Sequence, residues 1–207
     1  MSSQNASTPR RIPKQDRAEN RIRQMLATTE KLIGESGLES VTMTEIAATA
    51  GMSIGALYQY FPNKDAIASA MRTAYAQEMD RLWSDFLKRD GECDLLSFSD
   101  GIVDLMTKFI SAHPAYLMLF SAAVKSERSD LEREGLRKRF AVAFILRCPT
   151  LADAEAVCIA EMALAMVKSL IGVTMNAQPT GRKLLEKEMK IALFSYLSQR
   201  LGTGQSE

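Results

Sequence analysis

Histidine and cysteine are scarce in this chain of 207 residues, which contains one histidine and three cysteines. The cysteines (Cys93, Cys148 and Cys158) form no C-x-x-C pair, so the sequence indicates neither a zinc site nor a disulfide framework. It also lacks an H-E-x-x-H motif, a P-loop and a G-x-G-x-x-G motif. We therefore expect a protein that is not an enzyme and that needs no metal and no cofactor.

The chain also has almost no net charge: its 26 basic and 25 acidic residues give a net charge of +1. This balance excludes a polycation that coats nucleic acid, so any DNA affinity has to come from the local placement of charge. No apolar run opens the chain, and the uncharged stretch at 109–124 is too short to span a bilayer. We expect a cytoplasmic protein that makes no contact with a membrane.

The composition that remains is that of a globular protein, with 46% apolar and 25% charged residues. The apolar residues recur with helical spacing, and no alternating strand pattern appears, so we predict an all-α fold. A first helix ends near Gly37. Further helices are predicted at about 63–89, 95–112, 114–125, 127–147, 151–176 and 181–201.

The stretch from Thr42 to Lys64 is the most informative part of the chain. Thr42 can cap a short helix, and Glu45 three residues later completes a capping box. Gly51 stands where a chain leaving a helix needs positive φ, and Ser53 can cap a second short helix. Two helices that meet across a short glycine turn form a helix-turn-helix, whose second helix enters the DNA major groove.

This stretch resembles the DNA-binding signature of the TetR family of bacterial transcriptional regulators. The similarity covers roughly residues 17–70. It implies an N-terminal three-helix DNA-binding head and a larger C-terminal helical domain for ligand binding and dimerisation. The positions that carry the resemblance are Gly37, Val41, Thr42, Ile46, Ala47, Ala50, Gly51, Met52, Ser53, Leu57, Tyr58, Tyr60, Phe61 and Lys64.

The motif separates into residues for phosphate contact and residues for base reading. Two phenol hydroxyls and one ammonium flank the second helix and suit phosphate: those of Tyr58, Tyr60 and Lys64. The resemblance implies phosphate contacts at these positions and also at Thr42 and Ser53. Phosphate contacts set register without reading sequence. Base reading then falls to the exposed positions Thr44, Ile54, Gly55, Ala56 and Gln59, and a glutamine can pair with adenine through two hydrogen bonds. Tyr60 can alternatively be a core aromatic residue.

The predicted domains are a disordered basic arm at 1–14, a helix-turn-helix domain at 15–62, and a helical effector-binding and dimerisation domain at 63–207. The segment from residue 10 to residue 23 contains six basic residues and only two acidic ones. They fit either a solvated tail or an arm that contacts DNA phosphate or the minor groove.

The predicted helix at 151–176 has a smooth face of small residues, formed by Ala156, Ala160, Ala163 and Val167. The last helix has an apolar stripe that is too wide for one neighbour of this size. Both faces can fill the core of a single chain. We favour a homodimer in which the helices near 151–176 and 181–201 pair with their copies, as the resemblance also implies.

Soft and bulky side chains gather in the C-terminal domain. Such residues line adaptable apolar pockets, although they are more often plain core. Since the resemblance implies an effector pocket here, the candidate pocket residues are Met106, Phe109, Ile110, Met118, Phe120, Phe140, Phe144, Met162 and Met166.

The sequence thus predicts a repressor that a small apolar effector releases from double-stranded operator DNA. The alternative is a helical adaptor, or a helical-bundle protein that acts without binding DNA.

Overall fold

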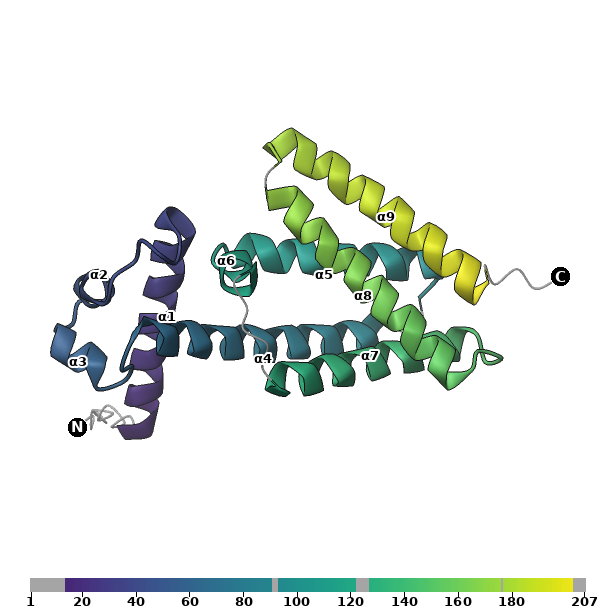
Figure 1. The fold of residues 1–207 in the computed structure, drawn as a ribbon. Helices are drawn as coiled ribbons and strands as arrows, with labels where there is room; N and C mark the ends of the chain where they lie inside the picture. Colours follow the sequence, from purple (N-terminus) through teal and green to yellow (C-terminus); the bar gives the residue numbers. More distant parts are fainter. Residues whose placement is uncertain (1–13, 91–92, 122–126, 176, 203–207) are drawn as a thin grey trace, which may run out of the picture. The chain divides into compact units, whose positions relative to one another are not determined.

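The computed structural model describes residues 14–90, 93–121, 127–175 and 177–202. These residues form helices and no strand, so the all-α fold class is confirmed (Figure 1). The predicted arm lies outside the described residues, except that Lys14 begins the first helix. The helices are α1 Lys14–Ser36, α2 Met43–Thr49, α3 Ile54–Tyr58, α4 Lys64–Asp90, α5 Leu95–Ala112, α6 Tyr116–Ser121, α7 Glu127–Arg147, α8 Asp153–Met175 and α9 Pro179–Leu201.

The chain divides into two compact units, Met1–Met71 and Arg72–Glu207, which we call the head and the body. The boundary between them falls inside α4. Within the described part of the chain, none of the helices combines the length and the apolar character that a membrane span requires.

The head has a small core of its own. From α1 it takes Met25 and Ile33, both fully buried, and between them Thr29, whose hydroxyl donates to the Met25 carbonyl oxygen at 2.8 Å. Leu26 and Leu32, which helical spacing also places on an apolar side, are only half-buried. The other buried apolar residues of the head are Val41, Ile46, Ala47, Ala50, Leu57, Phe61, Ile67, Ala68 and Met71.

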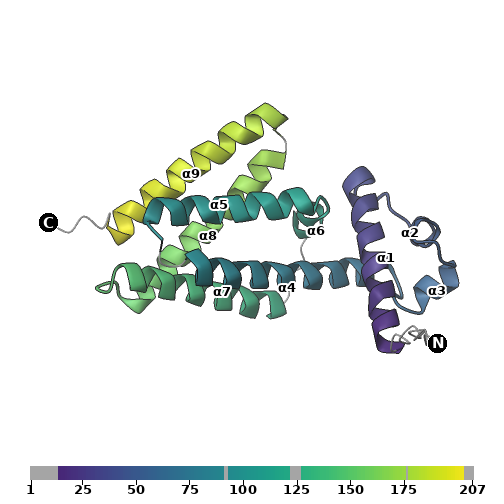
Figure 2. The same cartoon turned by 180° about the vertical axis from the view of Figure 1, so that it is seen from behind.

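The body is built around an aromatic core. In Figures 1 and 2, α8 runs beside α9, and α7 lies along the C-terminal half of α4. The Trp83 ring is 5.2 Å from that of Phe140, and the Phe86 ring is 5.3 Å from that of Phe98. Phe144 joins the same cluster. These edge and tilted ring contacts are the geometry that aromatic side chains prefer, so the core specifies how α4, α5 and α7 pack.

Three predicted helix starts differ by two residues from those in the structure, and prolines explain two of them. The third is that of α8, which begins at Asp153 rather than at residue 151. The helix predicted at 114–125 begins at Tyr116. His113, which precedes Pro114, lies outside the helical region with φ −123° and ψ 76°. The last helix begins at Pro179 rather than at residue 181. Pro179 occupies the first helical turn, where the N–H that proline lacks would have no helical partner.

Candidate nucleic-acid interface

The turn between α2 and α3 has the geometry of a helix-turn-helix. Gly51 has a φ of +66°, as its position in the motif predicts. Its N–H donates to the Ala48 carbonyl oxygen at 3.1 Å, and the N–H of Met52 donates to that of Ala47 at 3.0 Å. This pair of hydrogen bonds is a Schellman motif, which ends α2 and directs the chain into α3 within two residues.

Two hydroxyl residues start the helices of the motif. Thr42 Oγ1 accepts from the N–H of Glu45 at 3.2 Å, and Ser53 Oγ accepts from the N–H of Ala56 at 3.2 Å. Both residues are exposed. Since each hydroxyl group accepts through its oxygen, its hydrogen stays available to donate. The caps that fix α2 and α3 therefore also present two donors to the solvent.

The short helix α3 is held by one buried side chain and exposes most of the others. Leu57 is fully buried and anchors the helix. Tyr58 is 51% exposed and Ile54 is 39% exposed. Ala56 is half-buried. We call the exposed group the reading surface, and it consists of Thr44, Ile54, Gly55, Tyr58 and Gln59.

The five residues of the reading surface carry no formal charge, and residues 46–63 contain no acidic or basic side chain. Attraction to a phosphate backbone has to come from neighbouring cations. Arg21 and Arg23 of α1 are exposed. The side chains of Arg10, Arg11, Lys14 and Arg17, which the sequence assigns to a possible basic arm, lie outside the described residues.

Two of the predicted phosphate-contacting residues are less exposed than the others. Tyr60 and Lys64 are both half-buried. The Lys64 ammonium donates to the backbone carbonyl oxygens of Leu38 at 2.7 Å and Glu39 at 3.2 Å. The sequence contained no local signal for this contact, because it joins residues 25 and 26 positions apart.

The stretch from Gly51 to Gly55 reads G-x-S-x-G. In hydrolases this pattern places a nucleophilic serine on a sharp turn between a strand and a helix. Here Ser53 follows the helix α2, and its oxygen accepts the capping hydrogen bond of α3. The structural context of a nucleophile elbow is therefore missing at this serine.

The comparison with known families agrees with this geometry. The family model described as "Bacterial regulatory proteins, tetR family" matches residues 25–71. A second model, "Tetracyclin repressor-like, C-terminal domain", matches residues 94–197. The chain belongs to the TetR family of bacterial transcriptional regulators.

Individual relatives extend this finding. The HTH-type transcriptional regulator PksA of Bacillus subtilis (strain 168) is 38% identical over 80 residues, which are 38% of this chain and 38% of that protein. The match thus spans well under half of the curated relative.

Solved structures show the same fold. A TetR-family regulator from Pectobacterium atrosepticum has a TM-score of 0.66 at 17% identity, over 92% of this chain and 98% of that one. A TetR variant from Acinetobacter baumannii AYE in complex with minocycline has a TM-score of 0.56 at 16% identity, over 84% and 93%.

The body of this TetR-family chain separates the candidate pocket residues into three groups. Met106, Phe109, Phe140 and Phe144 are buried. Ile110, Met118 and Met166 are half-buried. Met162 is 47% exposed, and the side chain of Phe120 lies outside the described residues. The described candidates thus differ in burial, and the effector pocket stays a prediction.

A second cluster in the body surrounds the only histidine. The His113 ring is 4.5 Å from that of Phe109 and 5.0 Å from that of Tyr75, and Tyr116 closes the group at 5.0 Å from Phe109. His113 Nε2 lies 3.2 Å from a carboxylate oxygen of Glu78. The cluster ties α4 to the corner between α5 and α6.

The small-residue face of α8 does not lie at the surface, contrary to our assignment of it to the dimer. Ala156, Ala160, Ala163 and Val167 are at most 2% exposed. They pack inside the body, where α8 contacts α5, α7 and α9. The small side chains let these helices approach closely, so this face belongs to the core of the single chain.

The opposite sides of α8 and α9 expose large apolar side chains. Met162 and Val173 of α8 are 47% and 55% exposed, and Leu184 and Ile191 of α9 are 62% and 50% exposed. We call these four residues the outer face. Such exposure on two neighbouring helices is typical of a surface that a partner covers.

Proposed function

We propose that this protein is a homodimeric repressor that binds operator DNA through α3 and releases it when a small apolar molecule binds the body. The observation that supports DNA binding is the reading surface. The helix α3 follows the glycine turn and is capped by Ser53; it buries Leu57, while Ile54, Tyr58 and Gln59 are exposed. That arrangement suits insertion into the major groove.

The roles on DNA follow from chemistry and exposure. Gln59 offers a donor and an acceptor to adenine, and Ile54 and Ala56 offer apolar contact to thymine methyl groups. Thr44 at the start of α2 is a second polar reader, and Gly55 permits close approach of the backbone. The hydroxyl groups of Thr42, Ser53, Tyr58 and Tyr60 suit phosphate oxygens, which fix the register.

A second copy of the chain is the proposed partner of the outer face. A twofold axis beside α8 and α9 would bury Met162, Val173, Leu184 and Ile191 of both copies in a four-helix interface. A symmetric dimer then places two copies of α3 at about one DNA turn, roughly 34–36 Å, and requires a near-palindromic operator. In this proposal the dimer interface uses the exposed side of α8, opposite the small-residue face to which the sequence analysis assigned it.

The effector is proposed to bind among the middle helices of the body. Ile110, Met118 and Met166 are apolar and half-buried, so a ligand can cover them without opening the aromatic core. A family structure in complex with minocycline supports ligand binding by a body of this fold. To lower operator occupancy a hundredfold, the ligand has to discriminate between the two states of the dimer by about 2.7 kcal/mol.

The decisive experiment is selection of genomic fragments by the purified protein, followed by fluorescence anisotropy with the enriched sequence. We expect one near-palindromic site and an affinity at least about a thousandfold above that for random DNA. Ligands are then scored by release of this site. Enrichment of no sequence at low salt would reject the proposal and leave the helical adaptor as the better account. A ligand that binds the body but leaves operator affinity unchanged would reject the release mechanism.

A further inference from the structure

The side chain of Lys64 contacts the turn after α1, 25 and 26 positions earlier in the sequence. The ammonium nitrogen lies 2.7 Å from the Leu38 carbonyl oxygen and 3.2 Å from that of Glu39. Hydrogen bonds from a charged donor are about twice as strong as neutral ones. Lys64 is the first residue of α4, and the helix start is fixed in turn, because Asn63 Oδ1 accepts from the N–H of Ala66 at 2.8 Å.

The turn that Lys64 holds decides where α2 begins. The helix α1 ends at Ser36, and Gly37 reverses the chain with a φ of +83°. After the turn at 38–40 comes Val41, which is 1% exposed, and then Thr42, which caps α2. Moving the carbonyl groups of this turn therefore moves both the core residue and the cap. The helix α2 packs against α3, so the displacement reaches the reading surface.

A lysine is well suited to this task. Its ammonium group has three donors that rotate together, and two of them serve the neighbouring carbonyl groups. The third remains for an acceptor outside the protein. Arginine presents its donors in a flat, rigid fork, so it does not reproduce this pattern even though it carries the same charge.

We propose that Lys64 is a positioning residue that holds the head in its DNA-reading geometry before DNA arrives. Its contribution to operator binding is then preorganisation of α2 and α3 in addition to charge. This goes beyond the phosphate contact that the sequence assigns to it, and its DNA consequences rest on the proposed function.

The first test needs no DNA. Lys64→Met keeps most of the apolar stem and removes the ammonium group. Lys31→Met is the matched control, because it removes the same charge from the same unit at a side chain that is 74% exposed. Hydrogen exchange of the full chain is followed in peptides that cover 37–45. We expect exchange there to be about tenfold faster in Lys64→Met and unchanged in Lys31→Met. Unchanged exchange in Lys64→Met would overturn the proposal.

The second test separates positioning from a phosphate contact. Loss of a phosphate contact weakens binding to specific and to random DNA equally. It also reduces by about 1 the slope of log affinity against log salt concentration. Loss of positioning also lowers the ratio of specific to random affinity, by about tenfold in Lys64→Met. Lys64→Arg, which keeps the charge, should restore the salt slope but not the ratio. The proposal would be overturned if Lys64→Met weakened binding to specific and random DNA equally, or if Lys64→Arg fully restored the ratio of the two affinities. If the unmodified protein selects no DNA, the proposed function fails, while the exchange experiment still decides the role of Lys64.

Discussion

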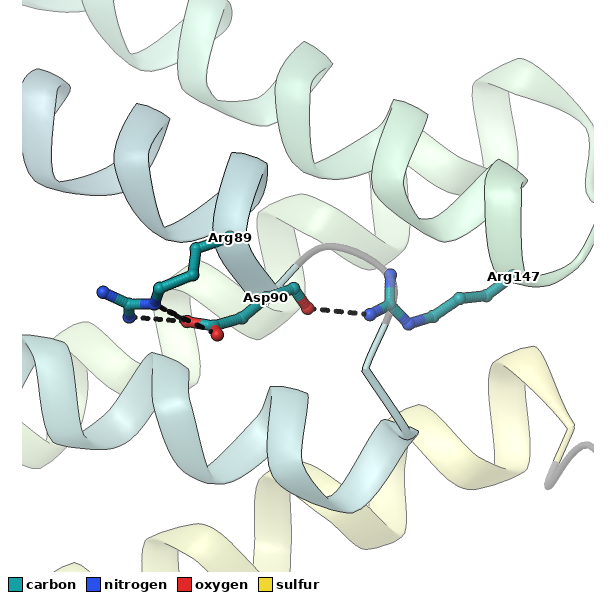
Figure 3. Close-up of polar contacts among 3 residues, drawn as sticks. All are labelled: Arg89, Asp90 and Arg147. Atoms are coloured by element: carbon teal, nitrogen blue, oxygen red, sulfur yellow. Dashed lines mark hydrogen bonds and ion pairs between the residues drawn. The ribbon is translucent and has the colours of Figure 1, made fainter.

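The guanidinium group of Arg147 lies over the ring of Phe98, with its central carbon 3.9 Å from the ring centroid. The same group donates to the backbone carbonyl oxygens of Asp90 at 3.4 Å and Cys93 at 3.2 Å, and to that of Ala143 at 3.0 Å. Figure 3 shows the reach from Arg147 to Asp90. Burial lowers the pKa of this arginine from its ordinary value, yet it keeps its charge. One side chain thus joins the ends of α4 and α7 to the first turns of α5.

Removing this guanidinium group should destabilise the body. We expect Arg147→Met to lower the free energy of unfolding by about 2 kcal/mol, because charged hydrogen bonds and a cation–π contact are lost together. Urea unfolding followed by the fluorescence of Trp83, the only tryptophan, reports on the body alone. Arg89→Met is the control, since the Arg89 side chain is 73% exposed and pairs with the Asp90 carboxylate, its neighbour in sequence (Figure 3). Similar unfolding midpoints for the two variants would contradict the structural role of Arg147.

A glycine in α5 should tolerate no side chain. A Cβ at Gly101 would lie 2.5 Å from Cε2 of Phe86, a ring that is 2% exposed and packed against Phe98. We expect Gly101→Ala to cost about 1–3 kcal/mol of stability through overpacking. Gly135→Ala should instead stabilise the body by about 0.5–1 kcal/mol, because that helical glycine is exposed and nothing lies within 4 Å of the added carbon. Thermal unfolding of both variants checks the opposite signs, and the same sign for both would contradict the account.

Local signals were sufficient where backbone chemistry alone decides the structure. The positive φ of Gly51 and the caps at Thr42 and Ser53 each follow from one residue and its immediate neighbours. For this reason the helix-turn-helix could be predicted almost residue by residue.

Signals that depend on a distant neighbour were ambiguous. Small residues at helical spacing on α8 indicate close packing but do not say against what, and the neighbours turned out to be helices of the same chain. In α4, Leu82 and Trp83 are adjacent apolar residues, and only the tertiary packing decides that Trp83 is buried while Leu82 is half-buried. The hydrogen bond from Lys64 to Leu38 joins the start of α4 to the turn after α1, and no local sequence pattern indicates such a contact.

On DNA, Gln59 should carry specificity. We expect Gln59→Ala to lower the ratio of specific to random affinity by about tenfold or more, with little effect on random DNA. Tyr58→Phe removes a hydroxyl group from the same short helix and should weaken binding to specific and to random DNA to a similar extent. Competition anisotropy at one fixed salt concentration measures both ratios. An unchanged ratio for Gln59→Ala would remove this residue from the set of base readers.

A charge on the outer face should dissociate the dimer. We expect Ile191→Glu to weaken self-association by at least about a hundredfold, because two copies of the charge would be buried without a partner. Val142→Glu is the matched control: Val142 is 58% exposed on α7, outside the outer face, and should leave association unchanged. Sedimentation velocity over a range of protein concentrations measures both. Self-association of Ile191→Glu equal to that of the unmodified chain would place the interface elsewhere.

The ion pair between α9 and α5 should make the body sensitive to alkaline pH. Lys190 Nζ lies 2.5 Å from a carboxylate oxygen of Asp104, and the lysine side chain is 24% exposed. The hydrogen bond to Asp104, helped by the charges of Asp104, Asp100 and Glu186, raises the pKa of Lys190 above its ordinary value of 10.5. A raised pKa means that the folded chain holds this proton more tightly than the unfolded chain. The stabilisation is therefore complete below pH 10.5 and is lost as the pH rises through the folded value.

Tyr196 adds to the same trend, because burial raises its pKa above its ordinary value of 10.0. The two contributions can be separated by substitution. Lys190→Met should flatten the loss of stability above pH 10.5, and Tyr196→Phe should flatten the part that begins near pH 10.0. Urea midpoints from Trp83 fluorescence between pH 8 and about pH 11.5 give both slopes. If Lys190→Met lost stability with pH as steeply as the unmodified chain, the pair with Asp104 would contribute nothing to holding α9 on α5.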